Sequence, residues 1–166
     1  MHRIWIVAAL AFWAGAVATA ETIMVSVHDQ ADSGDEDYVE ASRFHLSAAE
    51  DGVMSVLFEE GHIVFNLGEY GVFDGPEIAR RYMVREAARD GGARYVVDMM
   101  LEFERTEGDR LEPAGVNYEL REVDGGPPVA SGRLTGPFGE EDEASERGER
   151  SAALGRRVGE ELLSAW

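Results

Sequence analysis

Acidic side chains crowd one short segment of the chain and are its first candidates for chemistry. Four aspartates in nine residues could supply metal ligands: Asp29, Asp32, Asp35 and Asp37. Closely spaced carboxylate oxygens are ligands that Ca²⁺ prefers. However, the Asp-x-Asp-x-Asp-Gly order of an EF-hand is missing, and Gly34 is wrongly placed for it. We interpret residues 29–37 as a hydrated acidic loop, with a weak cation site as the alternative.

The other residue types form no catalytic or cofactor-binding motif. His28, His45 and His62 are not at metal-ligand spacing, and the chain has neither Cys nor a Gly-x-Ser-x-Gly sequence. The 68–75 segment is rich in glycine, yet it matches no phosphate-binding pattern and no Lys is present to reach a phosphate. Scattered carboxylates are too abundant to indicate glycoside hydrolysis. We therefore expect no catalytic residue, no cofactor and no dedicated metal site, and for His62 only a local hydrogen bond.

The charge balance limits the kinds of partner. The chain has 33 acidic residues against 15 basic ones, all of them Arg, for a net charge of −18. Nucleic acid and anionic lipid surfaces repel such a molecule, whereas cations and basic protein surfaces attract it. Without Cys the protein cannot be a disulfide scaffold, so core packing must stabilise it.

The N-terminal segment reads as a cleavable signal peptide over residues 1–20. Arg3 supplies a positive charge, residues 4–17 are apolar or small, and Ala18 and Ala20 give the small-x-small pattern of a cleavage site. The apolar run is shorter than the roughly 20 residues of a membrane-spanning helix. We expect a periplasmic or secreted protein with no stable membrane span after processing, and with no lipid anchor because no Cys follows the site.

After this segment we expect one α+β domain over residues 21–166. Alternating hydrophobicity predicts strands, and apolar residues at three- and four-residue spacing predict helices. The strands are expected at 22–28, 62–66, 93–104, 114–123 and 129–136, and the helices at 38–60, 76–90 and 151–166, with an acidic linker at 139–149.

The second helix has a recognisable start and an apparent apolar side. Asp74 and Glu77 have the spacing of a capping box, with Pro76 in the first turn. The residues expected on one side are Ala79, Tyr82, Met83, Glu86 and Ala87.

The predicted order of elements is β-α-β-α-β-β-β-α. It favours a mixed sheet with helices mainly on one face, and the short turns late in the chain favour an antiparallel meander of the last three strands. Right-handed crossovers are expected to place the first two helices on the same face.

Three stretches carry a family resemblance: Gly61–Phe65, Gly92–Val97 and Val116–Gly126. With the element order, they resemble the periplasmic α+β group that includes the TolB amino-terminal domain, CsgG, LpoB and FlgT. The resemblance covers most of residues 23–136. This chain lacks the lipidation Cys of CsgG and LpoB and the propeller of TolB. No functional residue of the group can be assigned to a position in this chain. The resemblance implies a non-catalytic adaptor that binds other envelope proteins.

The leading hypothesis is an exported, non-catalytic protein-interaction domain of the bacterial cell envelope with one or more envelope protein partners. Its expected contact surfaces are an edge strand and the 68–75 loop, where Tyr70 and Phe73 are predicted to be exposed. The alternatives are a periplasmic module that binds a cation or small ligand through residues 29–37, and an unrecognised hydrolase that uses scattered carboxylates.

Overall fold

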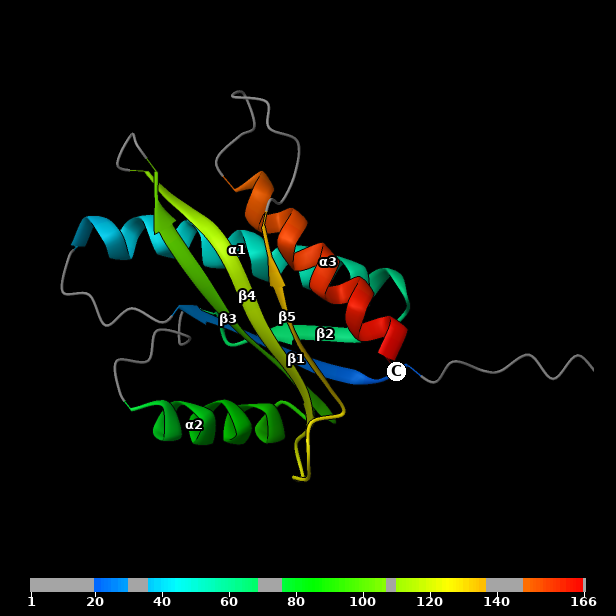
Figure 1. Ribbon diagram of the computed structural model, residues 1–166. Helices are drawn as coiled ribbons and strands as arrows, with labels where there is room; N and C mark the ends of the chain where they lie inside the picture. The colour runs from blue at the N-terminus through cyan, green and yellow to red at the C-terminus, as the bar shows by residue number, and fades with distance from the viewer. Residues whose placement is uncertain (1–19, 30–35, 69–75, 107–109, 137–147, 166) are drawn as a thin grey trace, which may run out of the picture.

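The strands assemble into one mixed five-stranded sheet in the order β2-β1-β3-β4-β5 (Figure 1). The computed structural model describes residues 20–29, 36–68, 76–106, 110–136 and 148–165. Its strands are β1 (Thr22–Asp29), β2 (Ile63–Asn66), β3 (Tyr95–Arg105), β4 (Leu111–Glu122) and β5 (Ala130–Thr135), and its helices are α1 (Glu36–Glu59), α2 (Glu77–Asp90) and α3 (Glu149–Ala165).

The pairing of the strands confirms the mixed sheet and the meander. β1 runs parallel to both of its neighbours, β2 and β3, while β3, β4 and β5 are antiparallel to one another in sequence order. The order β-α-β-α-β-β-β-α is as predicted. The domain is α+β because the crossovers occupy its first half and the hairpins its second.

Two helices share one face of the sheet, and the third lies on the opposite face (Figure 1). α1 and α3 pack together over the larger core, so the helices do lie mainly on one face. The narrower expectation that α1 and α2 share a face is wrong. β2 lies on one side of β1 and β3 on the other, so the two crossovers travel in opposite directions and right-handedness sends their helices to opposite faces.

The larger core depends on a close approach of α1 and α3. The sequence spacing predicts an apolar stripe on α3 of Leu154, Val158, Leu162 and Ala165. The first three are fully buried, whereas Ala165 in the last turn is exposed. A Cβ atom built on Gly155 would lie 2.0 Å from the Ala49 carbonyl oxygen of α1. Because no side chain fits there, glycine at this position allows the two helix backbones to touch.

The smaller core under α2 corrects the predicted orientation of that helix. The residues that α2 buries are Arg80, Val84 and Ala88, whereas Tyr82 is 65% and Met83 46% exposed. The predicted capping box is also not the start of the helix, since Pro76 occupies the N-cap without a side-chain cap and Asp74 lies outside the described residues. The apolar pattern predicts the wrong buried side for α2, because the side that is buried includes a charged residue, Arg80.

No helix among the described residues is long and apolar enough to cross a bilayer.

Candidate functional site

Most of the site residues predicted from sequence fall in segments that the structure does not describe. Tyr70 and Phe73, Asp32 and Asp35, and Ala18 all lie outside the described residues. Their predicted roles remain predictions.

Asp29 and Asp37 are the two described members of the acidic segment. Asp29 ends β1 and accepts a hydrogen bond from the Tyr38 hydroxyl. Burial raises the pKa of Tyr38, and the negative charge of Asp29 raises it further. Asp37 lies in the first turn of α1, near its N-terminus. Within the described ranges, no group of three or more His, Asp or Glu side chains is placed to hold a metal ion.

The three histidines lie in separate environments. His62 Nδ1 accepts a hydrogen bond from the Glu21 backbone N–H at 3.3 Å, so the histidine is hydrogen-bonded, but to a residue 41 positions away and not locally as expected. His45 Nδ1 lies 2.9 Å from the Ser151 hydroxyl oxygen, where it joins α1 to α3 in the interior. This pair resembles the nucleophile and base of a hydrolase only in its residue types, because Ser151 is fully buried.

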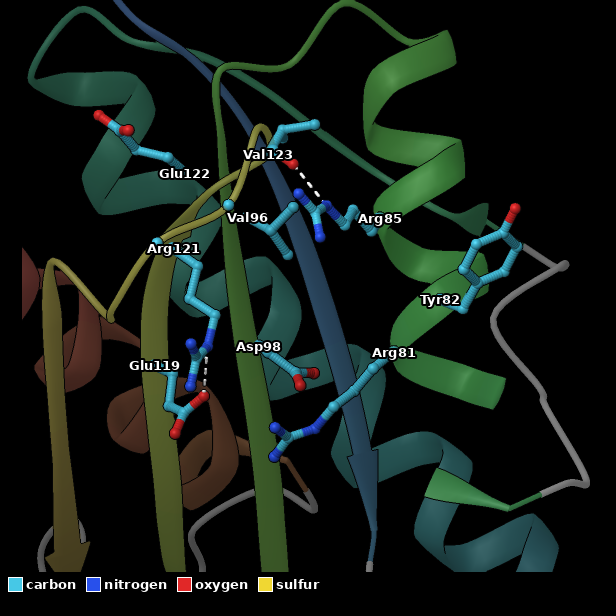
Figure 2. A pocket seen from close by; sticks show the side chains of 11 residues that line it. Arg81, Tyr82, Arg85, Val96, Asp98, Glu119, Arg121, Glu122 and Val123 are labelled. Atoms are coloured by element: carbon cyan, nitrogen blue, oxygen red, sulfur yellow. Dashed lines mark hydrogen bonds and ion pairs between the residues drawn. The ribbon is translucent and has the colours of Figure 1, made fainter. Parts of the chain in front are cut away.

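Among the described residues, a concave surface lies between α2 and the open half of the sheet, and we call it the groove (Figure 2). It encloses about 370 Å³. α2 covers β1 and β3, which leaves β4 uncovered on this face, and the groove follows the line where the helix stops covering the sheet. Its polar lining consists of Arg81, Arg85, Asp98, Glu119, Arg121 and Glu122.

The pairing of β3 with β4 makes neighbours of the groove residues that lie on the sheet. Val96 of β3 lies opposite Arg121 of β4, and Asp98 lies opposite Glu119. Two carboxylates directly opposite each other destabilise a sheet unless cations neutralise them. Arg121 Nε donates to Glu119 Oε2 at 2.8 Å, which neutralises one of them.

Arg80 neutralises the other carboxylate from beneath α2. Its Nη1 and Nη2 donate to Asp98 Oδ1 and Oδ2 at 2.8 and 3.0 Å. His28 Nδ1 lies 3.5 Å from the same Oδ1 and is buried, with no hydrogen-bond partner among the described residues. Burial outweighs the attraction of Asp98 and lowers the pKa of His28 from 6.5 to about 4. At neutral pH this histidine is therefore uncharged, although its distance to Asp98 is that of an ion pair.

A row of exposed side chains on α2 borders the groove. We call Ile78, Arg81, Tyr82 and Arg85 the α2 stripe, because their spacing of i, i+3, i+4 and i+7 places them on one side of the helix. Ile78 is 84% exposed, and the Tyr82 ring points away from the sheet at the outer rim of the groove (Figure 2). The stripe therefore extends the groove onto the outer surface of the helix.

Sequence reasoning missed this site, although it contained one usable signal. Arg80, Arg81, Arg85 and Arg89 fall within a single helix of a strongly acidic chain. Four arginines in 14 residues are an unusual concentration in so acidic a chain, although they form no catalytic motif.

Comparisons with known proteins place the chain by its fold. No family of known proteins matches the sequence, and no curated protein matches it. Solved structures with similarity include PelC from Paraburkholderia phytofirmans, crystallised as a dodecamer, at 23% identity over 84% of this chain and 86% of that one, with a TM-score of 0.49.

Two further solved structures belong to the group that the sequence resembles. The LpoB C-terminal domain from Salmonella enterica is 15% identical over 72% of this chain and 84% of its own, with a TM-score of 0.37. TolB from Acinetobacter baumannii is 13% identical over 89% of this chain and 28% of its own, with a TM-score of 0.39. At these identities the likeness concerns the fold alone.

Proposed function

We propose that this chain is an exported, non-catalytic protein-interaction domain of the bacterial cell envelope. The observation that carries the proposal is the α2 stripe, where Ile78 and Tyr82 are held in solvent beside a charged groove. Exposed apolar side chains next to a groove with polar walls are typical of a surface that another protein covers.

The location rests on the N-terminal sequence. An apolar segment at residues 4–17 followed by Ala18 and Ala20 supports export, and the strand that opens the sheet begins at Thr22, just beyond the predicted cleavage point. A folded domain that starts so close to this point is consistent with removal of residues 1–20.

Site-specific photo-crosslinking tests the interaction role. A benzoylphenylalanine placed at Tyr82 in cells that export the protein is expected to form a discrete protein adduct. The same group at Arg157, an exposed position on α3, is the matched control and is expected to form none. Equal adducts at the two positions, or no adduct at Tyr82, would contradict the proposal.

A further inference from the structure

Arg85 carries a positive charge that no carboxylate among the described residues neutralises. Its Nε donates to the Val123 carbonyl oxygen at 2.6 Å, which fixes the guanidinium plane in the groove. Its Nη2 lies 2.9 Å from where a Cβ on Gly125 would be, and Gly125 has a φ of +109°. Among the described residues no carboxylate pairs with Arg85, so its two terminal nitrogens face the groove without a charged acceptor.

The other charged groups near Arg85 are already occupied or directed elsewhere. Arg121 is paired with Glu119, and Arg81 with Glu77. Glu122 also lines the groove, but its carboxylate points away from Arg85 (Figure 2). Arg85 is therefore the guanidinium in this groove that is positioned to receive a carboxylate from outside.

The groove also has an apolar floor. Val96 and Val123 line the groove beside Arg85 and belong to the smaller core, so their positions are set by packing. A carboxylate that approaches Arg85 would bring its own methylene groups against these two side chains. Removal of water from that contact strengthens the Arg-carboxylate bond.

The remaining surface indicates what surrounds this carboxylate on the partner. With a net charge of −18, the chain attracts basic surfaces at long range and repels a second copy of itself. A partner that is attracted by the net negative charge is cationic overall. To bind Arg85, it also presents one acidic side chain beside an apolar one.

We propose that the groove takes an acidic side chain, flanked by apolar residues, from a cationic segment of a partner protein, and that Arg85 is its anchor. This inference rests on the proposed interaction role and names the chemistry of the partner. A polypeptide is favoured over a small anion because the α2 stripe continues the surface past the groove, and a small anion would leave Ile78 and Tyr82 uncovered.

The probes for the test are two peptides, acetyl-Lys-Leu-Glu-Leu-Lys-amide and its Gln counterpart. Nitrogen-15 NMR of the Arg85 side chain follows its Nε–H signal, which the bond to Val123 makes distinct. The Glu peptide is expected to shift this signal saturably and to bind about tenfold more tightly than the Gln peptide, as a charge-assisted bond predicts. Equal binding of the two peptides, or no saturation, would overturn the inference, and so would saturation by inorganic phosphate without saturation by the Glu peptide.

Variants connect the discrimination to Arg85. Arg85→Gln is expected to bind both peptides equally, while Arg89→Gln, on the same helix but outside the groove, keeps the tenfold difference. Backbone NMR spectra show whether either variant has lost its fold, and the comparison of peptides on the unaltered protein stands without any variant. If Tyr82 crosslinks a partner but the peptides do not differ, the anchor is wrong and the interaction role stands.

Discussion

Arg80 of α2 and Asp98 of β3 form a two-point ion pair in which the guanidinium is almost fully buried, with Arg80 only 8% exposed. This pair explains how α2 is oriented. α2 exposes Tyr82 and Met83 and buries an arginine, so it is rotated away from its apolar pattern. The buried arginine is needed because it neutralises the carboxylate of Asp98.

Removal of Arg80 is expected to destabilise the protein strongly. Arg80→Met leaves Asp98 in a half-buried site opposite Glu119, and we expect a loss of about 3 kcal/mol in the free energy of unfolding measured with urea. The double variant Arg80→Met with Asp98→Leu should recover most of this loss, since no uncompensated charge remains. The exposed pair of Arg81 with Glu77 is the control, and Arg81→Met should cost less than about 1 kcal/mol. Equal losses for Arg80→Met and Arg81→Met would contradict this reading.

Stability is expected to fall with pH below about 6.5 because of His28. The folded protein lowers the pKa of His28 from 6.5 to about 4, so between these values the unfolded chain binds the proton and the folded chain does not. The contribution of His28 to stability is therefore fully present above pH 6.5. It is lost as the pH falls from 6.5 to about 4, by up to about 3 kcal/mol in the free energy of unfolding.

His28→Leu is expected to remove that part of the slope. Urea unfolding at pH 7 and pH 4.5 measures the change for the variant and the unaltered protein, and the unaltered protein should lose about 2 kcal/mol more. Burial raises the pKa of Glu50, which makes an opposite contribution, but this residue lies on α1 and cancels in the comparison. Parallel pH profiles for the two proteins would show that His28 does not titrate as described.

A methyl group at Gly155 is expected to separate α1 from α3. Its Cβ would meet backbone, the Ala49 carbonyl oxygen, and Gly155→Ala should cost about 2–3 kcal/mol in urea unfolding. At Gly159 the added Cβ would lie 2.8 Å from Val56 Cβ, which is fixed to the α1 backbone, but 3.4 Å from the nearest backbone oxygen, that of Val53. The overlap is smaller than at Gly155, so Gly159→Ala should also destabilise the protein, by less than Gly155→Ala. The order of the two variants is the decisive result.

The exposed apolar residues of the α2 stripe are expected to contribute nothing to stability. Ile78→Ser and Tyr82→Ser should each change the free energy of unfolding by no more than about 0.5 kcal/mol, because both side chains are in solvent. Val84→Ser, one helix position from Met83 but buried, should cost more than about 2 kcal/mol. A large loss for Tyr82→Ser would mean that Tyr82 is held in place by the fold itself and not left for a partner.

Processing of the N-terminus can be tested at single-residue resolution. Mass spectrometry of the exported protein is expected to give a chain that begins at Glu21. Ala20→Phe should block cleavage, because the peptidase pocket takes small side chains, whereas Thr19→Gln at the intervening position should be cleaved normally. Normal processing of Ala20→Phe would place the cleavage site elsewhere.

The sequence predicts the elements well and their arrangement less well. The alternation in β3 and the apolar stripe of α3 are local properties, and the sequence predicts the first and all of the second except Ala165, which is exposed. The position of β1 between two parallel neighbours is a property of the whole sheet, so it cannot be predicted from the local sequence of any one strand. The faces of α1 and α2 follow from that strand order, which is why they could not be assigned from handedness alone.

The groove was beyond prediction for a related reason. Its charged residues come from a helix and two strands, and only the register that sets Asp98 opposite Glu119 makes them neighbours. Nothing in the local sequence of α2 distinguishes Arg85. Its environment is created by Val123 and Gly125, which the turn after β4 brings beside it.

The place of β1 in the sheet has a consequence for the timing of folding. β1 is the first strand to be made, yet its partners β2 and β3 follow at residues 63 and 95. Pairing that spans so much sequence is slow to form. An emerging chain therefore has no completed sheet until β5 is available, and a chain threaded across a membrane before that point would carry none.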